Sequence, residues 1–264
     1  VIERRGYMGS CRLLVILLFM SLASCTISDV PSIIEYDKQK ISFNINKASK
    51  SFVFLETSLE ITQETCSDAG ECTTQSESMQ SALGSGATVE YRGKAYVITA
   101  GHVCLPQAYD PYLKAMSWFG AIKNEVYGHG YFGNASRLTI VAVNLEKDVC
   151  ILKPDTRWIS PRLKLAKKLP KQGAKIFTIS APFGIFRPGM VLAFDGYLAG
   201  IDEEGDILIS APTKPGTSGS AILDKHERVI GIVHSAFIKM ESIGIGTPVE
   251  VIHDLFDELD KLEK

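Results

Sequence analysis

The stretch KPGTSGSAI (residues 214–222) is the part of this sequence that says most about its fold and chemistry. Small residues surround Ser218, and an apolar run typical of a β-strand follows. Glycine allows a tight backbone turn, so Gly216 can bring its amide close to a bound group. A serine hydroxyl needs a base to take its proton and donors to hold the oxyanion that forms. Ser218 is therefore a candidate nucleophile, with the N–H groups of Gly216 and Ser218 as candidate oxyanion donors.

Two earlier segments supply a candidate base and a candidate acid. In VITAGHV (residues 97–103) an apolar strand ends in small residues, and His102 follows. In EKDVCIL (residues 146–152) Asp148 opens an apolar strand, where it can accept the ring N–H of His102 and fix its tautomer. Either residue alone is more often structural. Their order along the chain, His, Asp and then Ser, is what indicates a catalytic triad.

The rest of the chain alternates short apolar runs with glycine and polar turns. Such runs recur at intervals of roughly 8 to 20 residues without helical periodicity between them, which predicts an all-β barrel or sandwich. Residues 86–100 are expected to form a hairpin, and the polar residues 60–84 a surface insertion. The C-terminus is expected to form an amphipathic helix. Its apolar residues at helical spacing are Val251, Ile252, Leu255, Phe256, Leu259 and Leu262.

Three sequence blocks resemble the signature blocks of the trypsin-like (chymotrypsin-fold) serine proteases. They are TAGHV (residues 99–103), KDVCIL (residues 147–152) and PGTSGSAIL (residues 215–223). KLPKQGAKIFTISAPFGIF (residues 168–186) and the segment from RVIGIVHSAF (residues 228–237) to the C-terminus are similar to the protease domain of bacterial high-temperature-requirement proteases. The similarity covers roughly residues 51–264.

The resemblance implies two six-stranded antiparallel β-barrels with a C-terminal α-helix. The domain would cover residues 49–264, with the barrel boundary near residues 155–172, and no PDZ domain is expected. It implies a serine endopeptidase that acts on a peptide or protein substrate, with His102 as base, Asp148 as its orienting acid and Ser218 as nucleophile. The expected mechanism needs no cofactor and no metal.

The resemblance also suggests residues that bind substrate. Thr213 would line the primary specificity pocket, and His234, Ser235 and Ala236 would form the strand along which substrate pairs. A threonine and a histidine near that pocket are similar to the pocket residues of proteases that accept Glu or Gln before the scissile bond. His234, however, stands one position later than the histidine of the glutamyl endopeptidases. The alternative is that His234 is a structural histidine near Asp148.

The charge balance excludes one class of partner. With 28 basic and 30 acidic residues the net charge is -2, whereas nucleic-acid binders normally carry a basic excess. No nucleic-acid partner is expected.

The N-terminus has the pattern of a targeting segment. Arg4, Arg5 and Arg12 flank an apolar stretch, residues 13–20, that is too short to span a bilayer. It ends in LASC, which resembles the lipobox of bacterial lipoproteins, with Cys25 as the lipid attachment site. Residues 1–25 are expected to be a signal peptide, of lipoprotein or ordinary type, and residues 26–48 a tether. The protein would be exported to the periplasm or cell surface, and a lipid anchor would be its contact with a membrane.

Export would place the cysteines in an oxidising compartment. Cys66 and Cys72 enclose a small polar loop and are expected to pair. Cys104 and Cys150 each stand two residues after a triad candidate, so they either form a second disulfide or remain two buried thiols.

Two other functional classes are compatible with parts of the pattern. A catalytically silent protease-fold binding protein would keep the fold and bind without turnover, although such proteins usually lose a triad residue. A purely structural surface lipoprotein would carry the three blocks by coincidence.

Overall fold

The structure is a computed structural model, and it describes residues 45–67, 70–116, 121–237 and 240–262. The predicted signal peptide, with Cys25, and residues 26–44 of the predicted tether lie outside the described residues. Residues 45–48, which were expected to end the tether, instead belong to helix α1 (Ile45–Lys50). Ala48 in this helix is only 1% exposed, so the folded domain begins before the expected boundary at residue 49.

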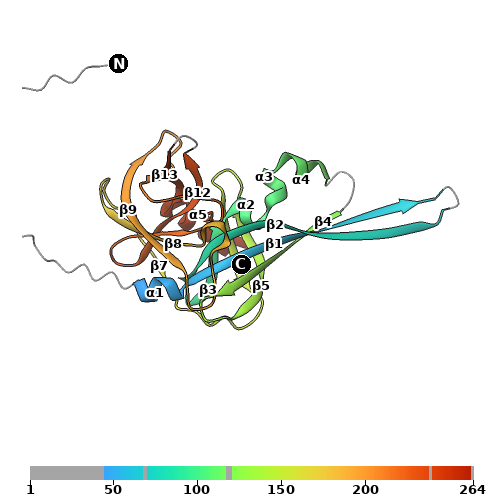
Figure 1. Ribbon diagram of the computed structural model, residues 1–264, viewed down its shortest axis with the longest axis horizontal. Coiled ribbons are helices and arrows are strands. Elements are labelled where there is room, and N and C mark those ends of the chain that lie inside the picture. The colour runs from blue at the N-terminus through green and yellow to red at the C-terminus, as the bar shows by residue number, and fades with distance from the viewer. Residues whose placement is uncertain (1–44, 68–69, 117–120, 238–239, 263–264) are drawn as a thin grey trace, which may run out of the picture. The chain divides into compact units, whose positions relative to one another are not determined.

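Two closed antiparallel barrels make up the domain (Figure 1). The first contains, in order around the ring, β1 (Phe52–Cys66), β2 (Cys72–Tyr91), β3 (Lys94–Ala100), β6 (Val149–Pro154), β5 (Ala135–Asn144) and β4 (Ala121–Gly130). The second contains β8 (Lys175–Ser180), β9 (Leu192–Ile201), β10 (Ile207–Ile209), β13 (Met240–Pro248), β12 (Arg228–Phe237) and β11 (Ala221–Leu223). Pairing of β11 with β12 closes that ring, and β7 (Lys164–Leu165) joins β12 in parallel. The predicted pair of six-stranded barrels is confirmed, with β7 as an addition.

The apolar runs of the sequence are continuous because many strands are buried on both faces. Successive side chains of a strand point to opposite faces. In β6, Cys150 and Leu152 point into the core of the first barrel, whereas Val149 and Ile151 belong to the cluster between the barrels. The side chains of β3 are likewise shared between these two clusters. A third cluster, which includes Ile176, Leu198 and Ile207, fills the second barrel.

Helix α5 (Val249–Leu262) packs across the two barrels. Phe256 is fully buried and stacks on Tyr91 of the first barrel, with ring centroids 4.3 Å apart. Burying a phenylalanine of this kind stabilises a fold by about 1.5–3 kcal/mol. The predicted apolar face is buried at Ile252, Leu255, Phe256 and Leu259, but the prediction was wrong for Leu262, which is 81% exposed.

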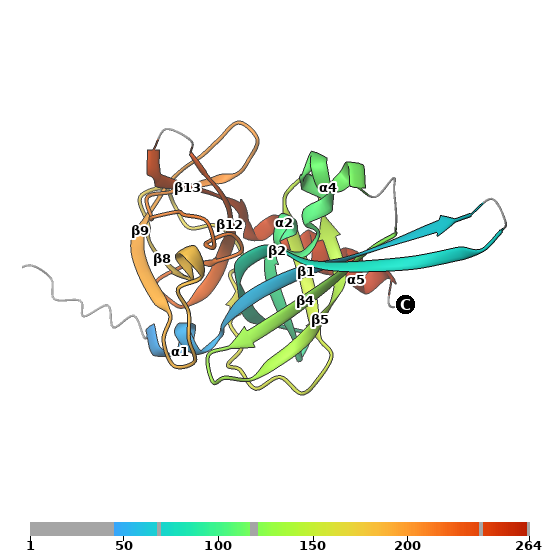
Figure 2. The same cartoon turned by 45° about the vertical axis from the view of Figure 1, so that its right-hand side comes forward.

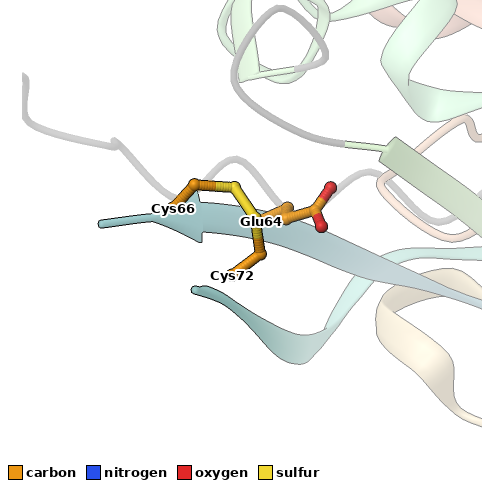
Figure 3. A group of neighbouring side chains, drawn as sticks. All are labelled: Glu64, Cys66 and Cys72. Atoms are coloured by element: carbon orange, nitrogen blue, oxygen red, sulfur yellow. A yellow bond between two sulfur atoms is a disulfide. The ribbon is translucent and has the colours of Figure 1, made fainter. Parts of the chain in front are cut away.

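Part of the expected surface insertion, residues 60–84, forms a two-stranded ribbon that projects from the first barrel (Figures 1 and 2). The expected bounds were too wide, because residues 60–62 and 76–84 pair with barrel strands. β4 pairs with β1 only as far as Thr62, whereas the ladder between β1 and β2 continues to Cys66 opposite Cys72. A disulfide joins these two cysteines at the tip (Figure 3). Glu64 lies close to both sulfurs, but a disulfide has no thiolate to offer a metal, so this group is not a metal site.

Short helices connect β3 to β4: α2 (Gly101–Cys104), α3 (Pro106–Tyr109) and α4 (Pro111–Met116). The barrels are joined by the segment between Pro154 and Lys175, which contains β7. A 3-10 turn, η1 (Pro182–Gly184), follows β8. Within the described ranges, no helix has the length and apolar character needed to cross a bilayer.

Candidate active site

His102 stands in the first turn of α2, where β3 ends. Glycine is required at the preceding position, because a Cβ on Gly101 would lie 2.2 Å from the Tyr109 hydroxyl and 3.0 Å from Asp148 Oδ1. The His102 side chain is 31% exposed, so the imidazole can meet both the protein and a ligand. The small residues before His102 thus allow close packing around its ring.

Asp148 is held by a turn immediately before β6. Its φ of 49° is in the left-handed region, which aspartate tolerates better than most residues. The carboxylate accepts two hydrogen bonds from one residue: His102 donates its backbone N–H to Oδ1 at 2.8 Å and its ring Nδ1–H to Oδ2 at 2.7 Å. This double contact fixes the ring tautomer, with Nδ1 protonated and Nε2 left to accept a proton.

The Asp148 carboxylate is kept ionised by its neighbours. Burial alone would raise the pKa of this carboxyl, but the hydrogen bonds and charge of His102, together with the charge of His234, hold that pKa below its usual value. A permanently negative group behind the imidazole stabilises the imidazolium that forms when the ring takes a proton.

Ser218 is positioned by its backbone between the two barrels. Its carbonyl accepts a hydrogen bond from the Ser85 N–H of β2 at 2.8 Å. The next residue, Gly219, donates to the Val233 carbonyl of β12 at 2.6 Å. Within the described residues, no hydrogen bond joins the Ser218 hydroxyl to the His102 ring. A nucleophile and its base often stand further apart without a substrate and close when it binds.

The peptide between Pro215 and Gly216 is fixed at its carbonyl end. The Phe183 N–H of η1 donates to the Pro215 carbonyl at 2.6 Å. Because a trans peptide points its C=O and N–H in opposite directions, the Gly216 N–H points away from η1. Gly216 has a φ of 91°, and a Cβ there would lie 2.5 Å from the Ala181 carbonyl, so this conformation requires glycine. The Ser85 hydroxyl also donates to the Gly216 carbonyl at 2.8 Å.

Three of the four predicted substrate-binding residues lie together on the second barrel. Thr213 is 5% exposed, and its hydroxyl would be 2.4 Å from a Cβ on Gly244. Gly244 is also the partner of Ala236 in the β12–β13 ladder, with Ser235 next to it. Among the described residues, no strand pairs with the other edge of residues 235–237.

The fourth residue, His234, is also on β12, but its ring lies beside Asp148 of the first barrel. Its Nδ1 is 4.0 Å from Asp148 Oδ2, and its Nε2 is 3.5 Å from Asp206 Oδ2. The structure therefore favours the second alternative stated from the sequence, a histidine near Asp148, over a place in the specificity pocket.

A disulfide joins Cys104 of α2 to Cys150 of β6. Both residues are fully buried. The bond ties the helix that carries His102 to the strand that follows Asp148. Of the two alternatives left open by the sequence, the structure has the bonded form.

A hollow of about 450 Å³ opens beside His102. It is lined by residues of the ribbon base and of α3 and α4, among them Ser81, Tyr109 and Leu113. A larger hollow of about 760 Å³ lies over the inter-barrel segment and contains none of the predicted site residues.

Several residues at the site were not predicted. Tyr109 lies beside the Asp148 carboxylate, and burial, together with the Asp148 charge, raises the pKa of its hydroxyl well above the usual range. Ser85 and Phe183 hold the loop that carries Gly216, and Asp206 faces His234. Phe183 lies in the quoted block of residues 168–186, but nothing in that block marks its role, and the other three lie outside the quoted blocks, so only the fold identifies these contacts.

Comparisons with known proteins agree with this architecture. Residues 84–232, more than half of the 264-residue chain, match a family model described as a trypsin-like peptidase domain. Among solved structures, the serine endoprotease from Yersinia pestis superposes with a TM-score of 0.58 at 18% identity. That match covers 81% of this chain and 64% of the other, so this chain spans less than two thirds of the Yersinia protein. At this identity the likeness shows the fold. No protein with a curated description matched the sequence.

Proposed function

Because this chain belongs to the family of trypsin-like peptidase domains, we propose that it is a serine endopeptidase that cleaves peptide bonds through an acyl-enzyme. The observation that carries the proposal is the double hydrogen bond from His102 to Asp148, next to a loop that presents Ser218. The His102–Asp148 contact is the half of a Ser-His-Asp triad that prepares the imidazole to take a proton from a serine.

In the proposed first step, Ser218 Oγ attacks the scissile carbonyl while its proton passes to His102 Nε2. The negative charge that develops on the carbonyl oxygen is stabilised by the N–H groups of Gly216 and Ser218. His102 then gives the proton to the leaving amine, and the acyl group remains on Ser218. In the second step, His102 takes a proton from water as that water attacks the acyl carbon. The bond to Ser218 Oγ then breaks, His102 gives the proton to Oγ, and the acid is released. Asp148 orients the imidazole and stays ionised throughout.

Substrate is proposed to bind as an extended strand. The open edge of residues 235–237 provides backbone partners, which is how proteins recognise peptides by β-augmentation. Thr213, buried beside Gly244, faces the side chain before the scissile bond. The proposed mechanism uses no metal and no organic cofactor.

The test is proteolysis with mapped cleavage sites. A denatured protein substrate is incubated with wild type, Ser218→Ala, His102→Ala and Ser220→Ala, and the new termini are identified by mass spectrometry. Cleavage by wild type and by Ser220→Ala, whose serine is buried on the same segment, with none by the other two, supports the proposal. A folded wild type that binds the substrate without cleaving it would instead support the catalytically silent binding protein.

We further propose that the protein is exported and anchored by lipid at Cys25, at the periplasmic or cell-surface side of a membrane. The support is the apolar segment followed by LASC in the sequence. Metabolic labelling with a fatty acid should mark the wild type and not Cys25→Ser. Equal labelling of both, or secretion without lipid, would contradict the anchor.

A further inference from the structure

The imidazole of His234 lies between two carboxylates. Asp148 Oδ2 is 4.0 Å from Nδ1, and Asp206 Oδ2 is 3.5 Å from Nε2. Two of these side chains are largely buried, with His234 14% exposed and Asp206 10% exposed. Nε2 has no hydrogen-bond partner with good geometry among the described residues. Burying such a group costs free energy, so its position calls for a physical reason.

A local irregularity in β12 places this side chain. The β12–β13 ladder pairs Val233 with Gly246 and then Ser235 with Ile245, so His234 has no partner of its own. Val233 belongs to the core of the second barrel. A shift of one residue along a strand moves a side chain to the opposite face. His234 consequently faces Asp148 rather than lying with Thr213 beside Gly244.

The charged groups around His234 come from several elements. His102 and Asp148 lie on the first barrel, with Tyr109 of α3 beside the Asp148 carboxylate. Asp206, directly before β10, also faces Lys147, whose Nζ is 3.5 Å from Asp206 Oδ1. Lys147 and His234 thus share one carboxylate between its two oxygens. The lysine charge partly neutralises Asp206, which weakens its pull for a proton on His234.

We propose that His234, backed by Asp206, is a positioning residue that holds the Asp148 carboxylate in place for His102. The inference rests on the proposed function, because it concerns the acid of the proposed triad. The same oxygen, Asp148 Oδ2, faces the ring of His102 at 2.7 Å and the ring of His234 at 4.0 Å. The two imidazoles therefore act on one carboxylate oxygen with unequal strength, and His102 holds the stronger contact.

The protonation state of His234 decides what it does to that oxygen. A neutral imidazole has one N–H, which can face Asp148 from Nδ1 or Asp206 from Nε2 but not both. On Nδ1 it directs its dipole at Asp148 Oδ2 across 4.0 Å, a distance too long for a hydrogen bond, without adding a full charge beside that oxygen. An imidazolium would add a full positive charge beside Oδ2 and draw the carboxylate away from His102. Burial lowers the pKa of His234 below its usual value, aided by the charge of His102 and opposed by those of Asp148 and Asp206. The neutral, supporting form is therefore the working form at neutral pH, and a second proton at acid pH disables the site.

The experiment compares two variants with a matched control. His234→Gln and Asp206→Asn each remove one member of the His234–Asp206 pair. If His234→Gln does not fold, Asp206→Asn still tests the inference. The control is His129→Gln, because His129 also pairs with a carboxylate, Glu56 Oε2 at 2.8 Å, outside the site. Each is assayed for kcat, KM, cleavage-site preference and the pH dependence of kcat/KM.

Both variants should lose kcat by roughly tenfold to a hundredfold, less than the roughly 10⁴-fold loss seen when a triad acid is replaced. KM and the preferred residue before the scissile bond should not change. In a plot of log(kcat/KM) against pH, the acid limb of wild type should approach a slope of two, because protonation of either imidazole reduces activity. The acid limb of His234→Gln should have a slope of one. His129→Gln should behave as wild type. An unchanged kcat and acid slope, or a changed residue preference, would overturn the inference, the latter in favour of a specificity role.

A spectroscopic measurement separates this inference from the proposed function. The His102 Nδ1 proton that faces Asp148 should give a far-downfield NMR signal, whether or not the protein turns over substrate. That signal should shift or disappear in His234→Gln and remain in His129→Gln. Identical signals in wild type and both variants would contradict the positioning role. Failure of wild type to cleave any peptide would contradict only the proposed function.

Discussion

His102 donates both its backbone N–H and its ring Nδ1–H to the carboxylate of Asp148, at 2.8 and 2.7 Å. The side chain of Asp148 thereby fixes both the start of helix α2 and the tautomer of the His102 ring.

The first prediction follows from this contact. In Asp148→Asn, an amide replaces the carboxylate that accepts both N–H groups of His102. An amide has only one oxygen to accept with, and its NH₂ group can only donate. The wrong tautomer then places a proton on Nε2, so kcat should fall by roughly 10⁴-fold with the fold retained. Steady-state kinetics beside circular dichroism checks this, and a loss of less than tenfold would contradict the role of Asp148.

The second prediction concerns the packing behind His102. In Gly101→Ala the new methyl group meets the Tyr109 hydroxyl at 2.2 Å, so the free energy of unfolding should fall by about 1–3 kcal/mol and activity should drop. The double variant Gly101→Ala/Tyr109→Phe removes the clashing oxygen and should recover part of both. Urea unfolding of the single and double variants measures the coupling. If the two changes were simply additive, Tyr109 would not be the group that excludes a side chain at position 101.

The third prediction concerns the disulfide between Cys104 and Cys150, which are 46 residues apart in sequence. Loop-closure entropy for this separation gives a stabilisation of about 4 kcal/mol. Cys104→Ala/Cys150→Ala should lower the urea midpoint strongly and reduce activity, because the bond connects the elements that carry His102 and Asp148. The control is Cys66→Ala/Cys72→Ala at the exposed ribbon tip, which closes a separation of only 6 residues and should cost less. Equal losses from both pairs would be the contrary result.

The fourth prediction is a loss of stability on acidification. The pKa of His234 is lowered in the folded state, so below about pH 6.5 the unfolded chain takes a proton that the folded chain resists. The unfolded state then binds more protons, and the free energy of unfolding falls as pH falls. The lowered pKa of Asp148 adds a loss of the same sign at more acid pH, below the usual range of a carboxyl. Urea unfolding between about pH 7.5 and about pH 5 should show the first loss in wild type and a smaller one in His234→Gln. Parallel curves would contradict it.

The sequence was most informative where the chemistry is local. Ser218, His102 and Asp148 stand in short blocks of small or apolar residues, so their types and order could be predicted, as could the two barrels. The family identified from those blocks is confirmed by the match over residues 84–232. The triad roles themselves remain predictions.

Other features depend on tertiary contacts that no local pattern encodes. The ribbon beyond Thr62 is made of polar residues without apolar alternation, so its strands could not be recognised. Tyr109 reaches Asp148 from a four-residue helix with no motif. The orientation of His234 depends on one bulge in β12. The alternation of apolar and polar residues in a sequence does not show where a strand has a bulge.

The most direct measurement is labelling of the protein with a fluorophosphonate, which reacts with an activated serine. Wild type and Ser220→Ala should each take up a single phosphonyl group, mapped by mass spectrometry to Ser218, while Ser218→Ala and His102→Ala should take up none. A well-folded wild type that remains unlabelled, or that is labelled at another residue, would contradict the assignment of Ser218 as an activated nucleophile.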